Sequence, residues 1–488
     1  MKKIYTSLLM LLVVSSGCKK YLEHVPDQRA SLNTVEKVSE LLITAYPQAS
    51  YITFAEAMTD NAGDKGISLT IVANRDPWYF EDVHSREEDS PDYYWNACYK
   101  AIAASNQALE AISKADNQAD YNAQKGEALV ARAYAHFMLV TLYSKVYDPA
   151  TADTDPGIPY VTEPEKIVFQ KYSRKTVAFV YQQIEKDLTE GLTLIKDNVY
   201  SVPKYHFTQA AAHAFAARFY LFKKDYQQVI THTNAVFTGG SIAANLKQVN
   251  STAYRSYQYL DLQAQYTQAT NNSNLLLTEA QSLWGRSYAA YRYSMTFPVY
   301  NQTYGAANVT RGFWGWQVYG QDNFLNVPKF KELFVRTSAN ADIGDPYNVI
   351  PLFTAEEVLF NRAEANTYLG NTADAIKDLN DYASTRIITS STIPVYNATI
   401  HTITADKINR FYSTLTLKDG LIKTILDFKR VEFCFEGMRW FDILRYKIPV
   451  VHTSYDLKTT ITLGPNDPHR LIQLPQEVTL AGIERNPR

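Results

Sequence analysis

The side chains with the clearest binding chemistry lie in two stretches where large aromatic rings stand beside amides and guanidinium groups. The first stretch contains Asn74, Arg75, Trp78 and Tyr79. A sugar ring presents an apolar face of C–H groups and a rim of hydroxyls, so its binder needs a flat aromatic ring flanked by polar groups. We therefore predict that these four residues form one wall of a carbohydrate-binding surface.

The second stretch, roughly residues 251–320, is crowded with tyrosine and tryptophan among many Asn, Gln, Ser and Thr. Long segments without a helical pattern are usually functional or disordered, and the aromatic content argues against disorder. Packing against neighbouring helices is the alternative for each ring, because large aromatic side chains are buried on average. We predict that the opposite wall is drawn from Trp284, Arg286, Tyr288, Tyr291, Trp314 and Trp316.

A third group of charged and aromatic residues surrounds Gly437 near the C-terminus. Its spacing predicts two helices joined at the glycine, with Glu432 and Glu436 four residues apart, followed by Arg439, Asp442 and Arg445 at intervals of three. A carboxylate and guanidinium network is feasible at such a junction. We interpret it as a structural corner, with a ligand site as the alternative, because paired charges beside large aromatics more often fix a junction.

The sequence contains no pattern of a catalytic centre. It has no His-Glu-x-x-His, no Gly-x-Ser-x-Gly and no glycine-rich phosphate loop, and its nine histidines are scattered without ligand spacing. A glycosidase pair of carboxylates is the alternative, since such pairs come together only in the fold. We predict a binding protein rather than an enzyme, with no cofactor and no metal ligands.

Net charge bears on the class of partner, and cysteine content bears on disulfide bonding. A net charge of −2 gives no reason to expect nucleic acid, which would need a basic face. Three cysteines are too few for a disulfide framework, and we predict that Cys98 and Cys434 are buried free thiols.

The N-terminus predicts export. Lys2 and Lys3 precede an apolar run over residues 4–14, which is the length of a signal-peptide core, and small residues then lead to Cys18. Residues 15–18 are similar to a bacterial lipobox, although Ser15 stands where Leu is usual. This implies a signal peptide over residues 1–17 and a lipidated Cys18, whose acyl chains would anchor the protein in a membrane.

The elements that must position these residues are mostly helices. Apolar residues at helical spacing predict helices over residues 31–47, 95–112, 129–140 and 177–195. Residues 217–230 align without a gap to residues 363–376, and both read as helix, tight turn, helix. Each unit is similar to a tetratricopeptide hairpin, but a long insert separates the two, so a regular solenoid is excluded.

The C-terminal motif at residues 435–442, with Arg430 and Glu432 before it, resembles the signature of the SusD/RagB family of outer-membrane nutrient-binding lipoproteins. The tail over residues 463–488 resembles the family's closing segment. The resemblance implies a mainly α-helical, SusD-like fold with dispersed tetratricopeptide-like pairs in a single domain over residues 18–488. Its helical scaffold would cover about 30–250 and 350–450, and an irregular, aromatic, loop-rich insert about 251–350.

The same resemblance implies a function. We expect a lipid-anchored protein, exposed on the outer membrane, that binds oligosaccharide or polysaccharide and delivers it to a SusC-like TonB-dependent transporter. Two alternatives stay open: a RagB-like member that binds peptides, and a tetratricopeptide-like scaffold whose aromatic loops bind a protein partner, because aromatic surfaces serve sugars and proteins alike.

Overall fold

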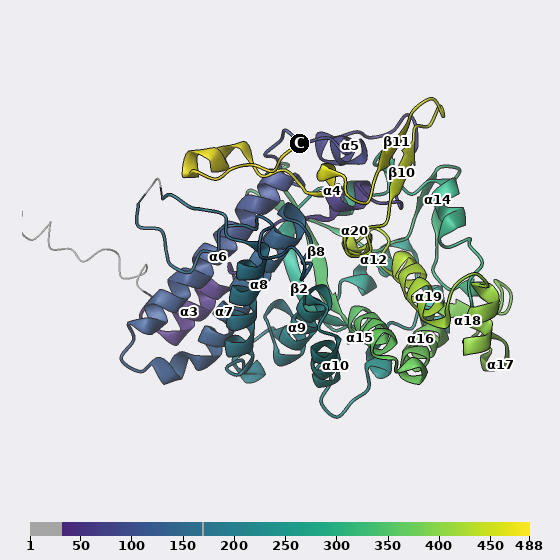
Figure 1. The fold of residues 1–488 in the computed structure, drawn as a ribbon, viewed down its shortest axis with the longest axis horizontal. Coiled ribbons are helices and arrows are strands. Elements are labelled where there is room, and N and C mark those ends of the chain that lie inside the picture. The colour runs from purple at the N-terminus through teal and green to yellow at the C-terminus, as the bar shows by residue number, and fades with distance from the viewer. Residues whose placement is uncertain (1–31, 168–169) are drawn as a thin grey trace, which may run out of the picture.

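The computed structural model describes residues 32–167 and 170–488, and its regular structure is mainly helical, as the sequence predicts. Figure 1 shows the helices as an arc that starts at α3 and α6, passes through α9 and α10 and ends at α16 to α19, with strands β2 and β8 inside the arc. The predicted signal peptide and the predicted lipidation at Cys18 lie outside the described residues. No helix in these ranges combines the length and apolar character that crossing a bilayer requires.

The first half of the arc consists of α3 (Val35–Leu42), α6 (Pro91–Ser113), α7 (Asn122–Tyr143) and α8 (Val177–Leu192), which confirms the four helices expected there. Each packs through its apolar stripe, as the burial of Cys98 and Ile102 on α6 illustrates. Helices α7 and α8 approach closely because Gly126 faces Gly191, where an added Cβ would lie 2.9 Å from the Gly126 carbonyl oxygen.

The repeat is confirmed as two helix pairs, α9 (Gln209–Lys223) with α10 (Tyr226–Ala235), and α15 (Ala355–Leu369) with α16 (Thr372–Arg386). The turns occupy equivalent positions: Lys224 has φ 64° and Gly370 has φ 82°, both left-handed, as is usual at a helix C-terminus. Helix α10 packs against α15, so the two pairs are neighbours in space despite the insert between them.

The insert is more regular than the sequence suggests. It contains helices α11 (Thr252–Ser256), α12 (Tyr259–Tyr266), α13 (Trp284–Ser287) and α14 (Phe297–Gln302), and most of an antiparallel sheet of order β2-β8-β7. The expectation of an irregular insert was wrong for β2 (Asn274–Gln281), β7 (Glu332–Arg336) and β8 (Gly344–Thr354). Strand β2 is buried over most of its length, so its apolar run lacks the alternation that marks a half-exposed strand.

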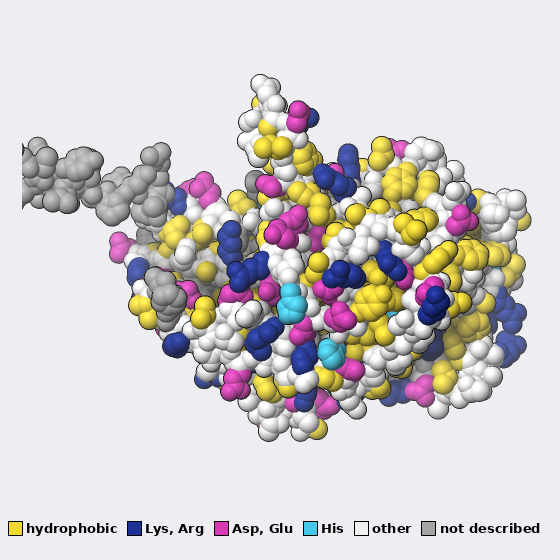
Figure 2. All heavy atoms as spheres, turned by 90° about the horizontal axis from the view of Figure 1, so that it is seen from above, with side chains coloured by type: hydrophobic (Ala, Val, Ile, Leu, Met, Phe, Trp, Pro, Cys, Tyr) yellow, Lys and Arg dark blue, Asp and Glu magenta, His cyan; other side chains and the backbone are white. Residues whose placement is uncertain are grey.

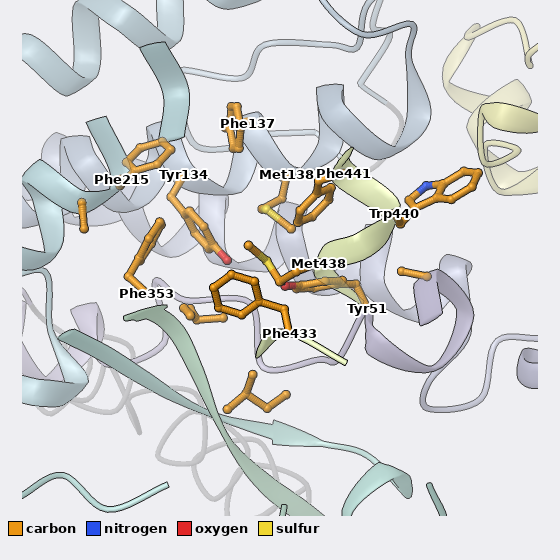
Figure 3. Close-up of a cluster of buried hydrophobic side chains, with 14 of the residues drawn as sticks. Tyr51, Tyr134, Phe137, Met138, Phe215, Phe353, Phe433, Met438, Trp440 and Phe441 are labelled. Atoms are coloured by element: carbon orange, nitrogen blue, oxygen red, sulfur yellow. The ribbon is translucent and has the colours of Figure 1, made fainter. Parts of the chain in front are cut away.

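The core joins the sheet to both ends of the chain. Tyr51 is the N-cap residue of helix α4 (Ile52–Ala57). In Figure 3 its ring converges with Phe433, Met438 and Phe441 of the C-terminal corner, and Phe353 of β8 lies close by. The Tyr51 hydroxyl donates to the Met438 sulfur at 3.6 Å, and its ring lies 5.5 Å from that of Phe441. Cys98 and Cys434 are both buried free thiols, as predicted.

Candidate functional site

The first predicted wall forms helix α5 (Val72–Trp78), but its tryptophan faces inward. Trp78 is fully buried between the rings of Tyr293 and His452, at centroid distances of 4.5 and 4.8 Å, and its indole N–H donates to the Ala62 carbonyl at 2.8 Å. Asn74 is buried as well, because its side chain bonds both the N–H and the C=O of Tyr293. The expectation that Trp78 and Asn74 are exposed was wrong.

The other two residues of this wall lie at the surface. The Arg75 side chain is exposed and pairs with Asp76 at 2.7 Å, which keeps the pKa of the guanidinium above its ordinary value. Tyr79 is half-buried, with its hydroxyl 3.5 Å from that of Tyr293. These two side chains can contact a ligand directly.

The second predicted wall is mostly interior. All five of its aromatic residues are buried: Trp284, Tyr288, Tyr291, Trp314 and Trp316. Trp284 donates its indole N–H to the Phe435 carbonyl at 3.1 Å and so fixes the insert to the C-terminal corner, whereas Tyr288 donates to the Val327 carbonyl at 3.1 Å within the insert. The expectation that they line a surface was wrong, and the packing alternative holds for them. Arg286 alone is exposed, in an ion pair with Glu332 at 2.5 Å.

The two stretches nevertheless meet. Strand β1 (Gly63–Asp64), in the loop that leads into the first stretch, pairs with β3 (Tyr293–Ser294) from the second, with Asp64 opposite Tyr293. The side chain of Arg292 then reaches Asp64 with both Nε and Nη2, at 2.6 and 2.8 Å. Around this pairing the structure exposes a different set of aromatic rings from the set predicted.

We call this set the aromatic rim: Tyr79, Phe297, Tyr300, Phe324 and Tyr455. Phe297, Phe324 and Tyr455 keep 52%, 44% and 60% of their surface exposed, and Tyr79 and Tyr300 are half-buried. The rings come from α5, from α14, from the hairpin of β5 (Tyr319–Gln321) and β6 (Phe324–Asn326), and from the turn between β10 (Val450–Thr453) and β11 (Thr460–Leu463). Seen from above in Figure 2, the half of the molecule that carries α5, α14 and β10–β11 shows groups of hydrophobic side chains separated by charged ones.

Asp64 organises one end of the rim. Beside its pairing with Arg292, its carboxylate accepts the backbone N–H groups of Gly66 at 2.8 Å and Tyr455 at 3.0 Å. Burial alone would raise the pKa of Asp64, but Arg292 and these N–H groups hold it below its ordinary value. Gly66 has φ 82°, and a Cβ there would lie 3.0 Å from the Tyr455 ring, so the glycine lets this ring lie flat against the loop.

Polar groups flank the rings at the other end. Lys65 donates to the Ala289 carbonyl at 2.9 Å and lies 5.6 Å from the centre of the Phe324 ring, and burial lowers the pKa of its ammonium to about 8. The Asn323 side chain accepts the Phe297 N–H at 3.2 Å. The rim thus combines flat apolar faces with an amide and the guanidinium of Arg292, which is chemistry that sugar recognition uses, while the Lys65 ammonium is buried and bonded beneath the rings.

A groove of about 710 Å³ lies elsewhere, where α9, α10 and α15 meet the end of helix α20 (Met438–Arg445). Tyrosines line it, but Tyr226 and Tyr368 stack face to face at 4.3 Å, and Tyr446 donates its hydroxyl to Glu364 at 2.7 Å. Because these faces and hydroxyls are already occupied by neighbouring side chains, we consider the rim the better candidate.

The C-terminal charges form a structural corner, as predicted. Helix α19 (Leu417–Glu432) ends before Gly437, which begins α20 with φ 69°, and a Cβ added there would lie 3.1 Å from the Tyr51 ring and 3.2 Å from the Ala55 Cβ. Two contacts are local, Arg445 with Asp442 at 3.6 Å and Lys429 with Asp442, and the other charges pair with distant segments: Arg439 binds Asp60, Glu436 binds Lys329, and Arg445 binds Glu364. Within the described ranges no group of His, Cys, Asp and Glu is arranged to hold a metal ion.

Sequence reasoning missed Phe297, Phe324 and Tyr455. One signal was available for Phe324, because it follows Gly320-Gln321-Asp322-Asn323, a run of turn residues that places its neighbours on the surface. Tyr455 also lies in a short polar stretch between two strands. Exposure at a turn therefore indicated the rim better than aromatic density did.

A SusD-like family model described as "Starch-binding associating with outer membrane" matches residues 20–221. A SusD-like carbohydrate-binding protein from Bacteroides vulgatus shares 19% identity with a TM-score of 0.65, over 92% of this chain and 97% of its own. A SusD superfamily protein from Bacteroides thetaiotaomicron shares 18% identity with a TM-score of 0.59, over 93% of this chain and 100% of its own. A laminarin-binding SusD-like protein shares 16% identity with a TM-score of 0.61, over 93% of this chain and 99% of its own. None of the curated proteins matches the chain. The resemblance to the SusD-like family is thereby confirmed, by sequence over residues 20–221 and by fold over nearly the whole chain.

Proposed function

We propose that this SusD-like protein binds oligosaccharides on the aromatic rim at the outer surface of the outer membrane and passes them, without breaking a bond, to a SusC-like TonB-dependent transporter. The observation that carries the proposal is the rim itself, because three exposed rings from three separate segments lie around one ion pair, Asp64 with Arg292. The starch-binding description of the matching family and the laminarin-binding relative support a glycan as the ligand class.

Lipid anchoring through Cys18 and removal of residues 1–17 belong to the same proposal, since delivery to a transporter requires a protein held at the membrane. Globomycin treatment of the expressing bacterium, followed by mass spectrometry of the chain, tests this part. Accumulation of uncleaved precursor supports anchoring, and a chain that is still cleaved before Cys18 in the presence of globomycin contradicts it.

The rim is tested by titrating purified protein with a panel of neutral glucans, laminarin included, and measuring heat. We expect one of them to bind, and we expect Phe324→Ala and Tyr455→Ala each to weaken it by about 2 kcal/mol, as large aromatic contacts at a binding centre do. Phe179→Ala is the matched control, because Phe179 is an exposed ring on α8, outside the rim.

Three results would contradict the proposal. Unchanged affinity in both rim variants would show that the rim does not bind the glycan. If Tyr226→Ala lost binding instead, the groove at α10 would be the binding site. Retention of peptides rather than glycans would favour the peptide-binding alternative. Release of shorter sugars during the titration would show an enzyme.

A further inference from the structure

The hairpin that β7 forms with β8 exposes an apolar edge strand that the proposed function does not use. Nearly every residue from 331 to 345 is exposed, and Leu333, Phe334 and Val335 keep 44%, 38% and 47% of their surface. Strand β7 lies at the edge of the sheet, because the strand order is β2-β8-β7. Such an edge is a template for another strand, and proteins normally shorten, cover or charge it.

The hydrogen-bonding direction of β7 follows from its neighbour. The Ser282 N–H donates to the Pro346 carbonyl at 2.9 Å, so the backbone of Pro346 faces β2 and not β7. Pro346 stands opposite Phe334 in the register of β7 with β8. In an antiparallel ladder Phe334 therefore directs its own N–H and C=O away from the sheet, and so do Glu332 and Arg336, two residues to either side. The outer edge offers three residues for pairing.

At the positions whose backbone groups face outward, the side chains of one copy complement those of a second copy. An antiparallel pairing centred on Phe334 places Glu332 of one copy opposite Arg336 of the other, twice, by symmetry. Leu333 then meets Val335 of the second copy on the face where Ile343 is 71% exposed. Arg336 has no carboxylate partner among the described residues, and Glu332 pairs with Arg286.

We propose that β7 pairs antiparallel with β7 of a second copy of this chain, centred on Phe334, so that two three-stranded sheets become one sheet of six. The pairing forms backbone hydrogen bonds at Phe334 and between Glu332 and Arg336, adds two ion pairs across the interface and covers Leu333 and Val335. It requires neither the aromatic rim nor a glycan, so it stands or falls separately from the proposed function.

Two variants test the pairing, each in the full chain in mild detergent by sedimentation velocity at micromolar concentration. Phe334→Pro replaces an exposed ring and, of the backbone bonding groups, removes one N–H that points outward, so it blocks the second copy while leaving the bonds between β7 and β8 in place. Arg336→Glu places a glutamate opposite Glu332 of the other copy, at both symmetry-related positions of the interface. We expect a dimer from the unaltered chain, a monomer from Phe334→Pro, and a dimer about tenfold weaker from Arg336→Glu.

A rescue and a control complete the design. Reversing Arg286, Glu332 and Arg336 together (Arg286→Glu, Glu332→Arg, Arg336→Glu) keeps both the internal and the proposed ion pairs with opposite signs, so it restores the dimer. Arg410→Glu makes the same charge change on helix α18 (Ala405–Phe411) and leaves the dimer unchanged. An unaltered chain that stays monomeric overturns the proposal, as does a Phe334→Pro chain that still dimerises or an Arg336→Glu chain with unaltered affinity. If Phe334→Pro fails to fold, the charge reversals decide the question alone.

Discussion

Two carboxylates four residues apart, Glu56 and Asp60, show how local surroundings set opposite charge behaviour at the same corner. Burial raises the pKa of Glu56 to about 7, although its oxygens accept the N–H groups of Phe435 and Gly437 at 2.9 Å. Burial acts in the same direction on Asp60, but Arg439 binds both of its oxygens at 2.9 Å and brings its pKa to about 2. A guanidinium outweighs desolvation, whereas two backbone N–H groups do not.

We predict that Asp60→Asn destabilises the folded chain at neutral pH and has almost no effect on its stability in acid. A carboxyl whose pKa is lower in the folded state stabilises that state above its unfolded pKa of about 3.9, and loses this contribution as the pH falls toward 2. The free energy of unfolding should drop by about 2 kcal/mol at pH 7 and hardly change near pH 2. Urea titrations at both pH values measure this, with exposed Asp116→Asn as the control. An equal loss at both values would contradict it.

For Glu56 we predict the opposite dependence of stability on pH. Because its pKa is higher in the folded state, the folded chain keeps this proton longer, so its contribution to stability falls as the pH rises from about 4.5 to 7. Glu56→Gln removes that slope, worth about 3 kcal/mol across the window, and adds a constant loss because one backbone N–H loses its acceptor. The difference between wild type and variant in denaturant titrations from pH 4 to pH 8 isolates the effect. A difference that does not vary with pH would refute it.

At the level of single residues, the sequence predicted only part of which side chains lie at the surface. Tyr79 and Arg75 lie at the surface near the expected place, yet Trp78 is buried because the ring of His452, a residue 374 positions away, covers it. Nothing local marks that contact. A tryptophan in an aromatic run reads the same whether its partner is a sugar or a distant histidine, so exposure depends on tertiary packing that a single sequence does not display.

Among the elements, the two helix pairs offer an internal comparison. Lys224 and Gly370 occupy the same turn position with the same left-handed backbone, and an added Cβ at Gly370 would have no atom within 4 Å. Only conformational cost separates the two residues. We predict that Lys224→Gly raises the free energy of unfolding by about 0.5 kcal/mol and that Gly370→Lys lowers it by about 1 kcal/mol. Thermal unfolding of both variants checks the prediction, which fails if the two shifts share a sign.

The same elements show which part of the fold was predictable. Helices α6 and α8 were, because a partly exposed helix repeats its apolar residues every three to four positions, and α7 carries apolar residues at the same spacing although it is buried almost throughout. Both pairs were predictable from the internal repeat. The sheet was not. Strand β8 carries Pro346 and Pro351, which argue against a central strand, and it tolerates Pro346 because its missing N–H would face β2, where Ser282 needs only an acceptor.

Across the whole molecule, Arg386 ties together segments that lie between Lys247 and Glu432 in the sequence. Its side chain is fully buried at the end of α16 and binds Glu356 of α15 at 2.8 Å, Glu432 of α19 at 2.9 Å and the Lys247 carbonyl. Burial opposes the charge of Arg386, but the two glutamates outweigh it and raise its pKa above the ordinary value. The carboxylates depend equally on this cation, since a buried charge without a partner is costly.

We predict that Arg386→Met lowers the free energy of unfolding by about 3–5 kcal/mol, because the Glu432 carboxylate then keeps, among the described residues, only the Tyr382 hydroxyl at 2.7 Å as a partner. Lys423→Met is the control: it breaks the exposed Lys423–Asp427 pair and should cost less than about 1 kcal/mol. Adding Glu432→Gln to Arg386→Met should recover part of the loss, since it removes the orphaned charge. Guanidinium titrations of all three variants measure these differences. A loss in Arg386→Met no larger than in the control would mean that apolar packing alone holds these helices together.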